Sequence, residues 1–324
     1  MVEHENNWIE LEVPARICLL GDKVDLLEKP VIAMAVDLLM KIRVKKRNDL
    51  LVRFYSRNLD FEKKFNLNNL EEAQDFDQPL KYWSAIFLRL RDKIGNSGFE
   101  AEVESNIPIG AGLSSSAALS VGLIKALNEL FGLEMTTYEI AELAYICEHD
   151  DLGISCGRMD QYAIAYGGVL YIETGSIPKV EKLNVEKLPI VVADSMEERR
   201  ASIILNKIKR QIEEKDPTVL KAFKEIEKIV YEGKKALLSG NTQKIGELMN
   251  RQQKQEGILQ ADTPKLNQMC NVAIKAGAYG AKQMGAGGGG CMEAICPPDK
   301  ESEIKYALEK LNVKTWIFNV FNYN

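Results

Sequence analysis

Histidine is nearly absent from this chain, whose 324 residues include only two, His4 and His149. A zinc cage built on histidines, or a nucleophilic triad that needs a histidine base, is therefore hard to assemble. The six cysteines are scattered without Cys-x-x-Cys spacing, so we expect buried free thiols and neither a zinc site nor a disulfide framework. Any catalysis should then depend on carboxylates, on Lys or Arg side chains, and on a phosphate-bound metal.

Long apolar runs and long basic runs are also missing. No stretch approaches the ~18 consecutive apolar residues that span a bilayer, and the acidic first residues lack the apolar core of a secretory signal. The formal net charge is −5, and no Lys/Arg block has the length of a nucleic-acid footprint. We expect a cytoplasmic globular protein that binds neither membrane nor nucleic acid.

The periodicity of the apolar residues predicts an α+β protein. Hydrophobic residues make up 46% of the chain, which is ample for a core, and the length allows two domains. The chain begins with β-prone segments, then alternates helical and strand patterns, and ends in β-α-β. We expect two lobes, residues 1–180 and 181–324. The expected strands are 9–20, 31–44, 50–54, 99–104, 167–172, 188–193, 291–296 and 315–320, and the expected helices are 79–94, 116–130, 136–148, 264–276 and 300–311, with a helical region at 201–251.

A glycine- and serine-rich segment, residues 106–118, opens a strongly periodic helix that is followed by Gly132 as a cap. Glycines let the backbone approach a ligand, hydroxyls supply donors, and the helix N-terminus favours an anion. We expect a polyphosphate, although a helix that is merely well capped is the alternative. The segment lacks the Gly-Lys-Ser/Thr of the common P-loop. Its candidate ligand-binding residues are Pro108, Gly110, Ala111, Gly112, Leu113, Ser114, Ser115 and Ser116.

Three other segments combine glycine with charged or strand-forming residues. Residues 14–25 read Pro-Ala-Arg-Ile-Cys-Leu-Leu-Gly-Asp-Lys-Val-Asp, and residues 156–161 read Cys-Gly-Arg-Met-Asp-Gln. Taken alone, both are more typical of surface turns. Residues 285–290 are a glycine run that satisfies Gly-x-Gly-x-x-Gly, but a strand pattern follows it where a dinucleotide fingerprint requires a helix. A dinucleotide site is therefore not expected.

In order and spacing, these segments resemble the motifs of the GHMP small-molecule kinases over nearly the whole chain. The glycine-serine segment is similar to Pro-x-Gly-x-Gly-Leu-x-Ser-Ser, which wraps the ATP phosphates in that family. Residues 14–25 and 156–161 are similar to Pro-Gly-Arg-Val-Asn-Leu-Ile-Gly-Glu-His-Thr-Asp and Cys-Gly-x-Met-Asp-Gln of the galactokinase branch. The resemblance implies ATP and Mg²⁺ as cofactors, an N-terminal lobe of the ribosomal-protein-S5 type and a ferredoxin-like C-terminal lobe.

The resemblance also implies roles for individual residues. Asp160 takes or orients the proton of the substrate hydroxyl, and Arg16 flanks that hydroxyl and stabilises the charge that develops on the phosphoryl group. Ser116 and Glu148 are the implied Mg²⁺ ligands, which agrees with the preference of Mg²⁺ for oxygen. The implied substrate-binding residues are Asp22, Lys23, Asp25, Gly157, Asp160 and Gly287.

The implied activity is an ATP-dependent kinase that phosphorylates a small molecule, as monomer or homodimer, with a sugar 1-kinase as the first interpretation. Asp22 and Lys23 replace the glutamate and histidine of the galactokinase motif. We therefore expect Lys23 to face a negative substrate group, as in an acidic sugar. The glycine run is similar to that of archaeal mevalonate kinases, so mevalonate kinase is the alternative, although that enzyme is expected to carry Lys in place of Arg16. A homologue that binds ligand without catalysis is a second alternative.

Overall fold

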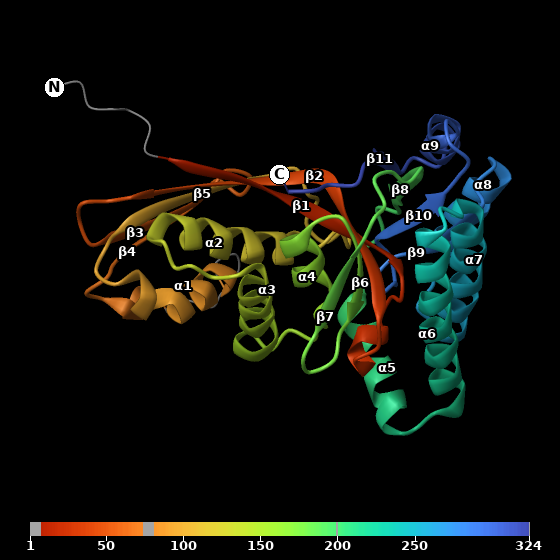
Figure 1. The fold of residues 1–324 in the computed structure, drawn as a ribbon, viewed down its shortest axis with the longest axis horizontal. Coiled ribbons are helices and arrows are strands. Elements are labelled where there is room, and N and C mark those ends of the chain that lie inside the picture. Colours follow the sequence, from red (N-terminus) through yellow and green to blue (C-terminus); the bar gives the residue numbers. More distant parts are fainter. Residues whose placement is uncertain (1–7, 74–80, 199, 324) are drawn as a thin grey trace.

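The computed structural model describes residues 8–73, 81–198 and 200–323, which form two β-sheets with helices packed against them (Figure 1). The strands are β1 (Ile9–Leu20), β2 (Val31–Lys46), β3 (Leu51–Ser56), β4 (Phe61–Asn66), β5 (Phe99–Ser105), β6 (Val169–Glu173), β7 (Lys179–Leu183), β8 (Ile190–Asp194), β9 (Gly280–Gln283), β10 (Cys291–Ile295) and β11 (Lys314–Phe318). The helices are α1 (Lys81–Ile94), α2 (Ser115–Phe131), α3 (Thr137–Ile146), α4 (Met159–Tyr166), α5 (Ala201–Glu213), α6 (Pro217–Leu238), α7 (Thr242–Ile258), α8 (Pro264–Lys275) and α9 (Glu301–Glu309), with short turns η1 (Val24–Leu27), η2 (Leu70–Ala73) and η3 (Cys147–Asp151).

The first sheet contains β1 to β7 in the order β4-β3-β5-β2-β6-β7, with β1 antiparallel to β2. The long strand β2 changes partner along its length, because residues 31–34 pair with β6 and residues 40–46 pair with β5. The β1–β2 register shifts between Pro14 and Ala15, opposite this change. The long strands β1 and β2 extend from β5 at one end of the first sheet to helices α6 and α7 at the other end (Figure 1).

The two halves of β1 and β2 have different burial patterns. Residues 13–20 of β1 are all buried, whereas the second half of β2 alternates between buried and partly exposed positions. Helix α2 packs on β1 and β2, and α6 and α7 of the C-terminal region also contact β1. At Gly233 in α6, an added methyl would lie 2.2 Å from Leu20 Cδ1. The alternation of buried and exposed residues is lost in the part of these strands where both faces of the sheet are covered.

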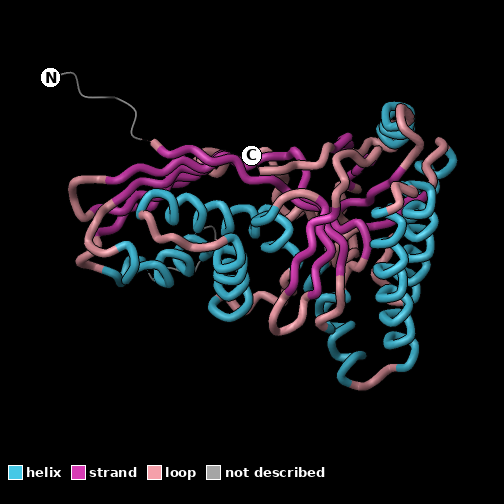
Figure 2. The backbone as a smooth tube through the Cα atoms, viewed as in Figure 1, coloured by secondary structure: helices cyan, strands magenta, loops and turns pink. Residues whose placement is uncertain are grey.

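The second sheet is antiparallel, with the order β11-β8-β10-β9. Figure 2 shows the strands of the two sheets converging near the centre of the molecule. After β11 the chain returns to the first sheet, where Val320 bridges to Val36 and the Gly168 N–H donates to the Phe321 carbonyl at 2.7 Å. The first sheet ends at residue 183 and the second begins at residue 190, and the lobe boundary at 180/181 stays a prediction.

Most expected elements are present, and the α+β class is confirmed. Strands β4, β7 and β9 were not expected, because they are short and two of them are rich in charged residues. Residues 79 and 80 of the first expected helix lie outside the described residues. All six cysteines are free, and five are buried. In the described part of the chain, no helix has the length and apolarity to cross a membrane.

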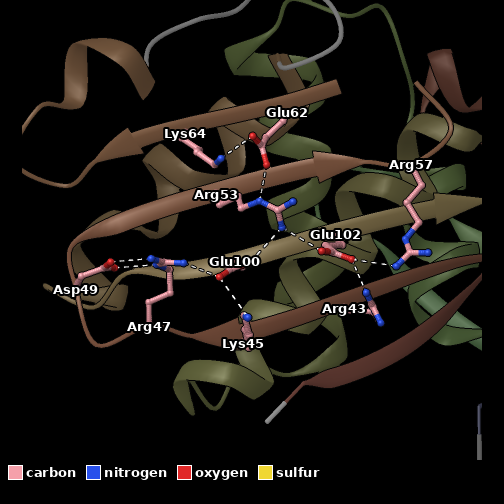
Figure 3. Close-up of polar contacts among 10 residues, drawn as sticks. All are labelled: Arg43, Lys45, Arg47, Asp49, Arg53, Arg57, Glu62, Lys64, Glu100 and Glu102. Carbon is pink, nitrogen blue, oxygen red and sulfur yellow. Dashed lines mark hydrogen bonds and ion pairs between the residues drawn. The ribbon is translucent and has the colours of Figure 1, made fainter. Parts of the chain in front are cut away.

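A ladder of ion pairs covers the face of the first sheet opposite the helices (Figure 3). Phe99, Ala101 and Val103 of β5 point into the core, so the alternating Glu100 and Glu102 point to the other face. Glu102 accepts hydrogen bonds from three arginines of neighbouring strands and turns, Arg43, Arg53 and Arg57. This ladder lets a sheet face without a covering helix stay in contact with water.

We predict that Glu102→Gln lowers the thermal midpoint and weakens the dependence of stability on acid. Burial alone would raise the pKa of Glu102, but the hydrogen bonds from Arg43, Arg53 and Arg57 lower it to about 2. Because the folded pKa lies below the unfolded value of about 4.3, this stabilisation is present above pH ~4 and is lost as pH falls toward 2. Thermal melts between pH 2 and 7 measure it, with the exposed Glu104→Gln as control. Equal thermal midpoints of the Glu102→Gln and Glu104→Gln variants at every pH would contradict the prediction.

Candidate active site

The loop between β5 and α2 has the conformation that its glycines predict. Gly110 and Gly112 have φ of 80° and 92°, which residues with a side chain rarely adopt. Ser114 precedes α2, also with positive φ, and the helix ends at a left-handed Gly132 as expected. The loop, residues 106–114, therefore leads directly to the free N–H groups at the N-terminus of a 17-residue helix.

Arg16 and Asp160 form a bidentate ion pair at the end of this loop. Arg16 Nε donates to Asp160 Oδ1 and its Nη2 donates to Oδ2, both at 2.7 Å. The remaining terminal nitrogen of Arg16 donates to the Gly112 carbonyl at 2.9 Å. Burial alone would lower the pKa of Arg16, but the charge of Asp160 and its hydrogen bonds raise it. One guanidinium thus joins strand β1, the glycine-serine loop and the start of α4.

Asp160 keeps room for one further hydrogen bond. Ser114 Oγ donates to Asp160 Oδ2 at 2.6 Å, in addition to the two bonds from Arg16. A carboxylate offers about four acceptor positions, so three are filled and one remains. The Asp160 side chain is 28% exposed, whereas that of Arg16 is 6% exposed. A hydroxyl group of a bound molecule can therefore reach Asp160.

Asp25 and Gly157 are brought together beside this pair. A methyl group on Gly157 would lie 2.0 Å from Asp25 Oδ2, so only glycine leaves space for the carboxyl group. Burial and the negative charge of Asp160 raise the pKa of Asp25 to about 7. The turn η1 and the residues before α4 thus meet beside the Arg16–Asp160 pair, and a substrate contact of Asp25 and Gly157 stays a prediction.

Glu148 and Ser116 lie in contact at the start of α2. Glu148 lies in η3, a π-helical turn that directly continues α3, and Ser116 Oγ donates to its Oε2 at 3.4 Å. The other oxygen, Oε1, is buried without a hydrogen-bond partner among the described residues. Burial and the charge of Asp160 raise the pKa of Glu148 to about 7. A buried carboxylate oxygen without a hydrogen-bond partner is suited to bind a cation. Among the described residues, however, no group of three or more His, Cys, Asp or Glu side chains could hold a metal ion by itself.

A cavity of about 560 Å³ extends from the glycine-serine loop toward β3 and α1. Sequence motifs indicated its loop side but not its far wall, whose residues carry no local signal. Trp83 is buried in the core against Phe54, whereas the neighbouring Tyr82 lines the cavity. The lining residues are Arg16, Met40, Phe54, Ser56, Asn58, Leu59, Tyr82, Val103, Ser105, Ile109, Gly110, Gly112, Ser114, Ser115, Ser116, Leu119 and Asp160.

The structure corrects the expectation that Lys23 faces a negative substrate group. Lys23 is 4% exposed, its ammonium lies 2.5 Å from Glu256 Oε2, and it donates to the Gly285 carbonyl at 2.8 Å. Asp22 is fully buried and accepts a hydrogen bond from Lys282 at 2.5 Å. Both charges are therefore neutralised inside the protein.

Gly287 packs against the end of α7. It has φ of 80°, and a methyl group on it would lie 2.1 Å from the Ala261 carbonyl oxygen. The next residue, Gly288, donates its N–H to the same carbonyl at 2.7 Å. The glycines are required by this close approach of backbone to backbone, and a substrate contact of Gly287 stays a prediction.

Comparison with known proteins decides the family. The model of the GHMP kinase N-terminal domain matches residues 81–168, and the model of the C-terminal domain matches residues 234–314. Mevalonate kinase of Pyrococcus horikoshii is 32% identical over 93% of this chain and 92% of its own length. The chain belongs to the GHMP kinase family. It is a small-molecule kinase with an alcohol group as acceptor, and it has the two-domain fold of that family.

Two further comparisons show how the kinase is placed within the family. The galactokinase of Pyrococcus furiosus is 28% identical over 93% of this chain and 92% of its own length. The crystal structure of the Methanococcus jannaschii mevalonate kinase superposes with a TM-score of 0.84 at 25% identity, covering 98% of this chain and all of that one. Both subfamilies are thus similar to this chain, and the identity is higher for the Pyrococcus horikoshii mevalonate kinase than for the Pyrococcus furiosus galactokinase.

We predict that Gly157→Ala impairs the kinase by displacing Asp25, because the new methyl overlaps the carboxyl group. The acceptor KM should rise about tenfold or more, while affinity for a nonhydrolysable ATP analogue, measured by calorimetry, changes little. Gly175→Ala is the matched control, since nothing lies within 4 Å of the added methyl. A normal acceptor KM for Gly157→Ala would show that Asp25 does not contribute to acceptor binding.

Proposed function

We propose that this kinase transfers the γ-phosphoryl group of Mg·ATP to a hydroxyl group held at Asp160. The observation that carries the proposal is the Arg16 guanidinium, which bonds Asp160 on one side and the Gly112 carbonyl on the other. This arrangement keeps a proton acceptor and a phosphate-binding loop at a fixed separation. Positioning and electrostatic stabilisation are the main requirements of phosphoryl transfer.

In the proposed reaction the acceptor hydroxyl donates its hydrogen bond to the free position on Asp160. As the oxygen attacks the γ-phosphorus, its proton passes to Asp160, and the bond to the β-phosphate bridging oxygen breaks. The fixed positive charge of Arg16 stabilises both the carboxylate and the phosphoryl oxygens. The loop glycines and the first N–H groups of α2 would hold the phosphates.

Ser116 and Glu148 would hold Mg²⁺ together with phosphate oxygens. The donor set fits, because both groups are oxygen ligands and Glu148 Oε1 is buried without another partner among the described residues. When bound, the ion neutralises charge on the phosphates of ATP. The cavity between the loop, β3 and Tyr82 is the proposed place for the nucleoside.

Mevalonate is the first candidate acceptor, because the curated mevalonate kinases match at up to 32% identity and the galactokinase at 28%. A neutral sugar is the second candidate, and one structural observation favours it. Asp25, held against Gly157, is a hydrogen-bonding group suited to hydroxyls, whereas Lys23, the cation two residues before it, is paired with Glu256. Lys23 therefore does not stabilise the negative charge of an anionic acceptor such as mevalonate or a uronic acid.

The acceptor is tested by coupled ADP release with Mg·ATP and a panel of mevalonate, galactose, other neutral hexoses, galacturonate and glucuronate. Each is assayed with the unaltered kinase and with Asp25→Asn. Turnover of mevalonate with little effect of Asp25→Asn would support the first candidate. Turnover of a neutral sugar that falls on this substitution would support the second. Turnover of a uronic acid alone would contradict both.

We predict that Asp160→Asn lowers kcat by about 10² or more, because an amide cannot accept the hydroxyl proton. Binding of an ATP analogue and the thermal midpoint are measured in parallel, to show that the loop still forms. Asp299→Asn is the control, because Asp299 is exposed and its positive φ of 68° is tolerated by asparagine. If Asp160→Asn kept full turnover, Asp160 would not be the proton acceptor.

A further inference from the structure

Asp22 and Lys23, at the end of β1, hold both polar groups of one residue of the glycine run. The Gly285 N–H donates to Asp22 Oδ1, and the Gly285 carbonyl accepts from Lys23 Nζ at 2.8 Å. Gly285 is the first residue of the run and has φ of 68°. Two adjacent side chains in the turn after β1 thus fix where the glycine run begins.

The other partners of these two side chains come from C-terminal elements. Glu256 of α7 pairs with Lys23, and Lys282 of β9 pairs with Asp22, both at 2.5 Å. Gln252 of α7 also donates to Asp22 at 2.7 Å and accepts from the Gly21 N–H at 3.0 Å. We call Asp22, Lys23, Gln252, Glu256 and Lys282 the interlobe cluster. All five are at most 4% exposed.

The charged groups of the interlobe cluster are paired with one another inside the protein. Burial alone would raise the pKa of Asp22, but Lys282 and Lys23 lower it below its ordinary value. Removal of one partner from a buried pair is strongly destabilising, because it leaves an uncompensated charge. Apolar side chains would hold the two lobes together at a lower desolvation cost than these buried charges. The directional hydrogen bonds of Asp22 and Lys23 with Gly285 therefore indicate that the two side chains position the glycine run.

The same turn also carries a residue of the acceptor side. Lys23 has φ of 70° and immediately precedes η1, whose second residue is Asp25. The turn η1 contacts α6, and Asp25 packs against Gly157. Loss of the hydrogen bond between Lys23 and the Gly285 carbonyl would therefore change the position of Asp25, which lies two residues further along the chain.

We propose that Lys23 is a positioning residue that sets the acceptor side of the site by fixing the turn η1 and the glycine run to each other across the lobes. This inference rests on the proposed function, since it assumes that the acceptor lies beside Asp25. It assigns Lys23 no contact with substrate. The bond from Lys23 Nζ to the Gly285 carbonyl transmits the effect, and Glu256 keeps the ammonium charge balanced.

The test separates positioning from stability with two variants of the full-length kinase. Lys23→Met removes the bond to Gly285 and leaves Glu256 unpaired, whereas Lys23→Met/Glu256→Gln removes the bond and the unpaired charge together. Lys29→Met is the matched control, because Lys29 forms a partly exposed pair with Glu227 on the other side of η1. The readouts are the thermal midpoint, KM for acceptor and for ATP, and hydrogen exchange of residues 284–291.

We expect Lys23→Met to lower the thermal midpoint, to raise the acceptor KM about tenfold and to leave the ATP KM within about twofold. The double variant should recover most of the thermal midpoint but keep the raised acceptor KM and faster exchange at 284–291. Recovery of the acceptor KM together with stability would overturn the proposal. So would a raised KM for anionic acceptors only, with normal exchange, because this would show direct contact with substrate.

The exchange measurement does not depend on the acceptor. If no compound in the panel is phosphorylated, the proposed function fails, but exchange at 284–291 still reports on the link from Lys23 to Gly285. Unchanged exchange in both variants would overturn the link itself. Faster exchange in the double variant at a near-normal thermal midpoint would support it.

Discussion

The active site depends on one ion pair, between Arg16 and Asp160. Its two parallel hydrogen bonds fix the carboxylate in one orientation, and the remaining nitrogen of Arg16 holds the Gly112 carbonyl. Strand β1, the glycine-serine loop and helix α4 meet at this guanidinium. A lysine in this place would supply a charge without the planar fork, so it could not align all three elements in the same way.

Negative charge is concentrated around that pair, and this explains the electrostatics of the site. Burial raises the pKa of Asp25 and of Glu148, and the negative charge of Asp160 adds to this effect, so the pKa of each is about 7. Arg16 forms its ion pair with Asp160 and only partly offsets the effect of that charge on Asp25. A site of this kind favours a divalent cation, which agrees with the oxygen ligands offered by Ser116 and Glu148.

Sequence predicted the parts of the site that depend on local backbone. The glycine-serine loop, the helix that follows it and its glycine cap were all expected, because positive φ and free helix N–H groups are properties of neighbouring residues. The far wall of the cavity was poorly specified by the sequence. Phe54 and Tyr82 come from a strand and a helix with ordinary patterns, and only the packing of α1 on β3 brings them to the loop.

The sequence by itself determined the α+β class, the family and the identity of the charged groups. Tertiary structure decided which charges face a ligand and which are neutralised. Lys23 and Arg16 both follow from the same motif, yet Arg16 meets Asp160 at an open site, whereas Lys23 meets Glu256 in the interior. The physical reason is that the partner of a buried charge is chosen by long-range packing, here of α7 on β1, and no local pattern near residue 23 encodes it.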